Sequence, residues 1–300
     1  GEPHTSFDDA PFTIISGSNV TGQSMRISSA ASVARVSTDH FVNSGGDSYA
    51  MEFVPVINLE GALGDPKVRQ ALQQSINYNG IAEKIYLGTA DPLRAIVPPS
   101  AWGYSEPVFQ EGYDALPAAE TDTDSAKALL EVSGYDGTPV VLANYSASEE
   151  ESKMATVIAD GANAIGMDVQ LKPLESAAFF GLFSDDPQAR AGIDAFVTAG
   201  YLDFPEPAQY YQYLTTGNYY NFAGYSNPEY DEAIAAAIAE FDDDARAAHI
   251  VEAQSIVTLD YVALPLVSQY VSLYYSDQLA GLAPSARYLY YPWGALLGGK

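Results

Sequence analysis

Residues 138–171 read TPVVLANYSASEEESKMATVIADGANAIGMDVQL, and this stretch decides the fold. Residues 138–145 are β-prone, and a second β-prone run follows at 169–171. Between them, Ser148 and Glu151 have the spacing of a helix capping box, and the apolar residues behind them recur at helical spacing. A strand, a helix and a second strand in this order are typical of an α/β fold with a mainly parallel sheet.

The same alternation extends outward in both directions from this stretch. Asp65 and Pro66 are residue types of a helix N-terminus, and apolar residues keep helical spacing from there to Gly88. Residues 91–118 are rich in proline and aromatic residues, so we expect an ordered crossing loop. The further strands that we expect are 49–59, 193–198 and 264–274, and the further helices are 126–134, 175–183, 228–240 and 243–259.

The composition fits one large domain or two modest ones and excludes several classes of protein. Hydrophobic residues make up 47% and charged residues 17% of the 300 residues, which excludes a disordered chain. The formal net charge of −26 disfavours nucleic acid and anionic membrane surfaces as partners, because both are negatively charged. With no cysteine, disulfides and thiolate metal sites are excluded, and no apolar run is long enough for a transmembrane helix.

No segment carries a strong local signature of catalysis or of cofactor binding. The glycine patterns of serine-hydrolase elbows, dinucleotide-binding turns and phosphate-binding loops are absent from the sequence. His4, His40 and His249 are far apart in the sequence, so no two histidines have the spacing of metal ligands. With 39 acidic residues, a carboxylate pair for glycosidase chemistry has almost no specificity as a signal. We therefore expect no cofactor and no metal.

Tyrosine is concentrated in one part of the chain. Eight of the 22 tyrosines lie within residues 201–230. A tyrosine ring combines an apolar face with a hydroxyl group that can orient a ligand, so a cluster of them favours the wall of a ligand cleft. A tyrosine-rich core with hydrated edges is the structural alternative.

Asp203 is the acidic residue that this pattern singles out. It lies in an aromatic, proline-rich turn directly after the expected strand 193–198. In open α/β sheets, ligands bind beyond the carboxyl ends of the strands. A partly desolvated carboxylate at such an edge requires a cation, an amine or sugar hydroxyls as its partner. The alternative is an aspartate that only stabilises its own turn.

Several segments together resemble one protein family. They are 65–72 (DPKVRQAL), 98–104 (PPSAWGY), 126–135 (AKALLEVSGY), 222–231 (FAGYSNPEYD), and 252–254 (EAQ) followed by 264–266 (LPL). With these motifs in the family's order over about residues 65–270, the sequence resembles the extracytoplasmic solute-binding proteins of ABC importers, in the class that binds oligopeptides, dipeptides or nickel.

The resemblance implies a type II periplasmic-binding-protein fold, with two α/β lobes that close on a ligand by hinge bending. Residues 60–265 resemble the second lobe, and residues 1–59 and 266–300 would belong to the first. Family members are considerably longer than this chain, so the resemblance covers their C-terminal portion. We therefore expect the first lobe to be incomplete here.

The resemblance also implies a site. Asp203 matches the acid that holds a peptide's amino terminus, and Gly200 stands where a tryptophan is usual. Arg190 is the nearby candidate for the far carboxylate, and Gln269 lies on a first-lobe edge that faces the cleft in relatives. The ligand-binding residues that we expect are Asp203, Tyr201, Trp102, Tyr219, Tyr220, Asn221, Arg190 and Gln269.

The expected function is a non-catalytic receptor that delivers a small solute to a membrane permease. A peptide, an oligosaccharide or another cationic or neutral solute would fit the tyrosine-rich site, and nucleic acid would not. The protein would act outside the cytoplasm, either free in the periplasm or anchored by a lipid, and its leader would have been removed before Gly1. Two alternatives stay open: a carbohydrate enzyme with a carboxylate pair in the same cleft, and a surface protein with a disused pocket.

Overall fold

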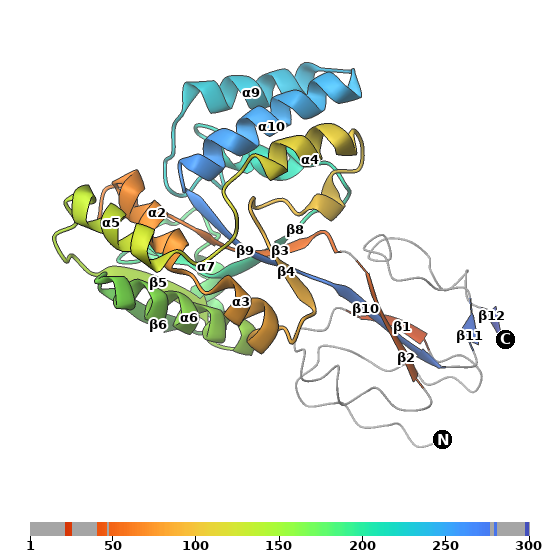
Figure 1. Cartoon of the computed structure of the whole chain (residues 1–300), viewed down its shortest axis with the longest axis horizontal. Coiled ribbons are helices and arrows are strands. Elements are labelled where there is room, and N and C mark those ends of the chain that lie inside the picture. The colour runs from red at the N-terminus through yellow and green to blue at the C-terminus, as the bar shows by residue number, and fades with distance from the viewer. Residues whose placement is uncertain (1–21, 26–40, 47, 277–278, 281–297, 300) are drawn as a thin grey trace.

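The computed structural model describes most of the chain, and Figure 1 shows its arrangement. The described residues are 22–25, 41–46, 48–276, 279–280 and 298–299. His4 and His40 lie outside them. Within them, two sheets and their helices form a large body, and a three-stranded sheet lies to one side (Figure 1).

The stretch that decides the fold forms a parallel sheet covered by a helix. Strand β5 (Val140–Tyr145) lies between β6 (Val169–Leu174) and β7 (Ala195–Phe196), and both pairings are parallel. Helix α6 (Glu149–Ile165) connects β5 to β6 and begins where the Ser148 hydroxyl accepts a hydrogen bond from the Glu151 amide. The strand–helix–strand prediction is therefore confirmed.

A second sheet corrects the expectation of a mainly parallel arrangement. Its order is β4 (Ala90–Pro92), β9 (Ala263–Gln269), β3 (Ala50–Pro55) and β8 (Thr198–Tyr201), and every pairing is antiparallel. The residue pattern of a strand shows which side chains are buried. It does not show the direction of the neighbouring strand, which depends on tertiary contacts.

The expected single strand 193–198 is divided between these two sheets at Val197. Its first part is β7 in the parallel sheet, and the chain then enters β8 in the antiparallel sheet. We call this junction the seam. The buried Asp194 carboxylate joins its two sides, because Oδ1 accepts from Asn58 Nδ2 at 2.7 Å and Oδ2 accepts from the Val141 amide at 2.7 Å.

Two neighbouring strands of the antiparallel sheet lead to the smaller sheet. β10 (Val271–Ser276) follows β9 and pairs with β2 (Phe41–Gly46), which precedes β3 in the chain. β1 (Gly22–Met25) lies on the other side of β10. β11 (Leu279–Ala280) and β12 (Gly298–Gly299) form a separate short pair.

Helices cover the two large sheets as separate groups. α2, α5 and α6 contact one another beside the parallel sheet, whereas α4, α9 and α10 pack together over the antiparallel sheet (Figure 1). No described helix has both the length and the apolar character that crossing a membrane requires. The bounds are α2 Pro66–Ser75, α3 Tyr78–Gly80, α4 Glu106–Asp114, α5 Thr123–Ser133, α7 Ser176–Gly181, α8 Ala208–Tyr211, α9 Pro228–Ala239 and α10 Asp243–Leu259.

The helix that begins at Asp65 is shorter than its apolar spacing predicts. α2 ends at Ser75, and the Asn77 side chain then caps α3 by accepting from the Gly80 amide at 2.8 Å. A π-helical turn, η1 (Ile81–Ile85), completes the segment. An asparagine that caps a new helix interrupts the old one, although the apolar spacing continues across the break.

Arg69 of α2 fixes the end of α10 to the loop before α2. Its guanidinium donates to the carbonyl oxygens of Leu63, Gly64 and Asp260 at 2.7–3.0 Å. Burial lowers the pKa of Arg69, and the nearby Asp260 carboxylate opposes this effect. An arginine of the 65–72 motif therefore has a structural role.

Candidate functional site

A pocket of about 270 Å³ lies at the seam. β3, β7, β8, β9 and the segment from α8 to residue 222 contribute its walls, so both large sheets take part. Its lining consists of Phe53, Pro55, Ile96, Phe183, Phe196, Thr198, Ala199, Gly200, Tyr201, Asp203, Gln209, Tyr210, Tyr213, Leu214, Tyr220, Phe222 and Ala263.

Seven of the lining rings form an unbroken chain of contacts, which we call the ring series. Successive ring centroids are 4.9–6.2 Å apart, with interplanar angles of 60–89°. Aromatic pairs favour this edge-to-face geometry because the positive edge of one ring meets the negative face of the next. In order, the series is Phe53, Tyr210, Tyr213, Tyr220, Phe222, Phe183 and Phe196.

Gly200 makes room for one of these rings. A Cβ atom at Gly200 would lie 2.5 Å from the Tyr210 hydroxyl oxygen and 3.1 Å from the Met51 sulfur. The phenol of Tyr210 therefore occupies the space that a side chain at position 200 would need. Burial raises the pKa of Tyr210, which keeps its hydroxyl group neutral in the pocket wall.

Asp203 lines the pocket from an exposed position after β8. Its Oδ2 accepts a hydrogen bond from Gln209 Nε2 at 3.2 Å. The other amide atom, Gln209 Oε1, is buried and has no hydrogen-bond partner among the described residues. Of the lining residues that the structure describes, Asp203 is the only carboxylate, and none is lysine, arginine or histidine. A positively charged group would therefore meet one carboxylate here and no basic side chain of the described lining.

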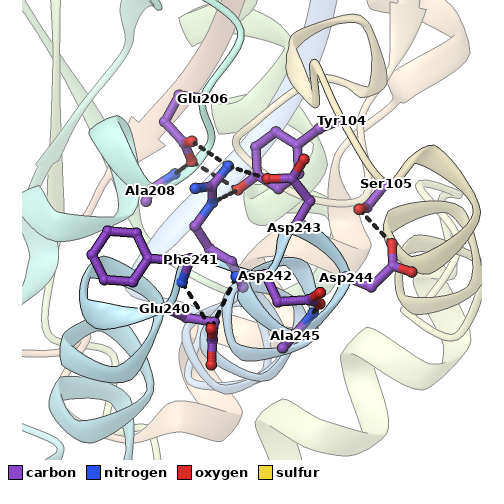
Figure 2. Close-up of polar contacts among 11 residues, drawn as sticks. Tyr104, Ser105, Glu206, Ala208, Glu240, Phe241, Asp242, Asp243, Asp244 and Ala245 are labelled. Atoms are coloured by element: carbon purple, nitrogen blue, oxygen red, sulfur yellow. Dashed lines mark hydrogen bonds and ion pairs between the residues drawn. The ribbon is translucent and has the colours of Figure 1, made fainter.

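Tyr104 and Arg246 hold the loop 202–207, which carries Asp203, through contacts with Glu206. Tyr104 donates to Glu206 Oε1 at 3.0 Å and accepts from Arg246 Nε at 2.9 Å, while Arg246 Nη2 lies 3.7 Å from Glu206 Oε2 (Figure 2). The Arg246 guanidinium also lies 4.2 Å from the centroid of the Tyr104 ring. We call these three residues the clamp.

Two further features accompany the clamp, a close approach of the two loops at Gly103 and a raised pKa of Tyr104. A Cβ atom at Gly103 would lie 2.1 Å from the Pro205 carbonyl oxygen, so the two loops approach more closely than any other residue would allow. Burial raises the pKa of Tyr104 to about 12, and Glu206 adds to the rise, whereas the hydrogen bond from Arg246 opposes it. Tyr104 is therefore a neutral hydrogen-bond donor at ordinary pH.

The family model for bacterial extracellular solute-binding proteins, family 5 Middle, matches residues 21–222, more than half of the chain. The chain belongs to family 5 of these proteins. The resemblance found in the sequence motifs is thereby confirmed.

Among curated family 5 relatives, the periplasmic oligopeptide-binding protein OppA of Haemophilus influenzae is 30% identical over 220 residues, 70% of this chain and 38% of OppA. The dipeptide-binding protein DppE of Bacillus subtilis is 26% identical over the same shares of the two chains. The chain thus spans about two fifths of the length of these relatives. They are named as binding proteins and not as enzymes.

Solved structures show the same fold. DppA from Helicobacter pylori, in complex with the peptide STSA, superimposes with a TM-score of 0.72 at 20% identity, over 86% of this chain and 50% of that one. AppA from Clostridium difficile gives a TM-score of 0.78 at 24% identity, over 91% and 55%. The periplasmic-binding-protein fold predicted for this family 5 chain is therefore confirmed, over about half of each solved chain.

The structure brings together three of the eight predicted site residues. Tyr201, Asp203 and Tyr220 line the pocket, and the two tyrosines are 51% and 46% exposed, so their rings lie at its mouth. The other five residues lie outside the lining. Trp102 is buried and stacks on Phe109 with the ring centroids 5.6 Å apart.

The remaining four residues make contacts with their own surroundings. Tyr219 donates to the Phe183 carbonyl at 3.1 Å, and the Asn221 amide bonds to main-chain groups of its own turn. Arg190 donates to two nearby carbonyl oxygens and lies over the Phe222 ring, 4.4 Å from its centroid. Gln269 is buried in β9 and donates to Glu52 at 3.3 Å.

Several lining residues were not predicted from the sequence. Phe53, Ile96, Phe183 and Phe196 come from four separate segments, and no local pattern connects them. Gln209 could have been predicted from the sequence, because it lies six residues after Asp203 in the same tyrosine-rich region. Across the described part of the chain, no group of three or more histidine or acidic residues could hold a metal ion.

Proposed function

We propose that this chain is the ligand-binding part of a receptor that takes up a peptide and releases it unchanged. The observation that carries the proposal is the pocket at the seam, which has aromatic walls and one carboxylate at its edge. The named relatives, which bind oligopeptides and dipeptides, support a peptide as the solute.

In this proposal, Asp203 binds the ammonium group of the peptide's first residue. Gln209 positions the Asp203 carboxylate, and the described lining of the pocket contains no lysine, arginine or histidine. A charge-assisted hydrogen bond of this kind is shorter and stronger than one between neutral groups. An ammonium group therefore matches the site better than a hydroxyl group does.

We further propose that the receptor works outside the cytoplasm and delivers its peptide to an ABC permease in the membrane. The description of the family as extracellular and of OppA as periplasmic supports this location. A lipid anchor stays a prediction, as does the division into first lobe (1–59 and 266–300) and second lobe (60–265). Closure of the two lobes on the peptide would follow from that division.

The Asp203→Asn variant tests the proposal. We expect it to weaken binding of trialanine by about 10–100-fold, the range for loss of a charge-assisted hydrogen bond. Isothermal titration calorimetry with trialanine and with N-acetyl-trialanine measures the effect, and acetylation should weaken binding to the wild type in the same way. Asp160→Asn on the exposed face of α6 is the matched control and should bind as the wild type does. Unchanged binding by Asp203→Asn would contradict the proposed role.

The carbohydrate-enzyme alternative receives less support. Glycosidases need two facing carboxyl groups, and the described lining of this pocket contains one. The named relatives do not support the oligosaccharide alternative, because both are peptide-binding proteins by name. A chromogenic glycoside should therefore remain uncleaved.

A further inference from the structure

We propose that the pocket selects peptides whose first residue has an aromatic side chain. That side chain would enter the pocket while the peptide's ammonium group lies at Asp203. The inference rests on the proposed function and adds to it a preference for one class of side chain. It follows from the size, the walls and the charge of the pocket.

The size of the pocket accommodates a large side chain. Its volume is about 270 Å³. A cavity of about 150 Å³ is enough to bind benzene, so an aromatic side chain has room to enter this pocket. The methyl group of alanine would leave most of the space empty or hydrated. The pocket therefore distinguishes large first residues from small ones.

The walls of the pocket suit an aromatic ring. Eight of the 17 described lining residues are aromatic, and seven of them belong to the ring series. A ring that enters the pocket can add one more edge-to-face contact to this chain. Such contacts add stabilisation beyond the burial of apolar area, which an aliphatic side chain does not gain. An aromatic side chain is therefore favoured over an aliphatic one of similar size.

The charge of the pocket disfavours acidic side chains. Asp203 is exposed, as are the lining tyrosines Tyr201 and Tyr220, so a positive group is attracted to the exposed part of the pocket. The described lining offers no basic residue that could pair with a ligand carboxylate. A glutamate side chain would therefore be repelled by Asp203 and would enter a mainly aromatic space without a basic partner.

Calorimetry with four tripeptides tests this preference on the 300-residue chain. We expect Phe-Ala-Ala to bind at least about tenfold more tightly than Ala-Ala-Ala, the order expected for burial of a large apolar side chain. Leu-Ala-Ala should bind more weakly than Phe-Ala-Ala, and Glu-Ala-Ala should bind more weakly than all the others. Equal affinities for Phe-Ala-Ala and either Leu-Ala-Ala or Ala-Ala-Ala would overturn the inference while leaving the proposed function intact. Absence of binding by all four would contradict the proposed function itself.

A variant that fills the pocket tests where the side chain binds. Ala199 lies on β8, lines the pocket and is exposed, so Ala199→Phe places a ring in the pocket without disturbing the core. In this variant, the dissociation constant of Ala-Ala-Ala divided by that of Phe-Ala-Ala should fall towards one. Ala235→Phe on the exposed face of α9 adds the same ring elsewhere and should keep the wild-type ratio. An unchanged ratio in Ala199→Phe would overturn the inference.

Discussion

At the scale of single residues, Gly200 and Tyr210 behave as one unit. The absence of a side chain at Gly200 lets the Tyr210 phenol lie in the pocket wall, where it continues the ring series from Phe53 to Tyr213. The aromatic wall beside Gly200 is thus supplied by Tyr210 from α8.

This unit leads to a prediction for Gly200→Ala. The new Cβ atom would lie 2.5 Å from the Tyr210 hydroxyl oxygen, so we expect a loss of about 1–3 kcal/mol in the free energy of unfolding, typical of overpacking. Urea denaturation measures it. In a Tyr210→Phe background the nearest remaining atoms are 3.0 Å away, so the cost should be smaller. If Gly200→Ala lowered the free energy of unfolding equally in both backgrounds, the contact with the Tyr210 hydroxyl group would not be the cause of the loss.

At the scale of elements, the clamp connects the start of α10 to the Asp203 loop. The acidic residues at the N-terminus of α10, with Asp242 as the capping residue, suit the positive end of the helix dipole. Arg246 follows one turn later and contacts Tyr104, which precedes α4, and Glu206, which precedes α8. A surface helix thereby helps to position the loop that carries the candidate binding residue.

The clamp predicts a local effect for Arg246→Gln. Loss of the partly exposed ion pairs with Glu206 and Asp243 and of the contacts with Tyr104 should cost about 1 kcal/mol. Hydrogen exchange should become faster at the amides of Leu202 and Glu206, which donate to the Tyr49 and Phe204 carbonyl oxygens, and should not change in α6. Lys153→Gln breaks the exposed ion pair with Glu149 on α6 and serves as the control. If exchange in Arg246→Gln changed by the same amount in the loop 202–207 and in α6, the role of the clamp would be contradicted.

The same scale shows what the sequence could predict. Local signals placed the strand–helix–strand unit, the caps at Asp65 and Ser148 and the tyrosine-rich side of the pocket. They could not predict the switch at Val197, because the alternation of side chains is the same whichever sheet a strand joins. The rule for open parallel sheets therefore does not explain why Asp203 lies at the pocket, since β8, which precedes it, is antiparallel to its neighbour.

At the scale of the whole molecule, burial of tyrosine makes stability sensitive to alkali. Burial is the largest cause that raises the pKa of nine described tyrosines in the folded chain. In the unfolded chain these phenols titrate near pH 10. The nine are Tyr78, Tyr104, Tyr113, Tyr210, Tyr211, Tyr213, Tyr225, Tyr230 and Tyr261.

The direction of the pH effect follows from proton linkage. Above about pH 10 the folded chain holds more protons than the unfolded chain, so the free energy of unfolding falls as the pH rises further. For Tyr104 the fall continues to a pH of about 12. Urea denaturation at increasing pH should show this loss, together with late ionisation of the phenols in near-ultraviolet absorbance. Added salt screens repulsion within the chain of net charge −26 and should leave the loss in place. Constant stability from pH 9 to 12 would contradict the burial of these rings.

The seam gives the pocket a mechanical property. Phe196 belongs to the parallel sheet and Phe53 to the antiparallel one, and Val197 is the single residue between β7 and β8. Because the two rings line one pocket from different sheets, a twist of one sheet against the other would change the shape of the pocket. The affinity for a ligand in the pocket would then depend on the angle between the sheets.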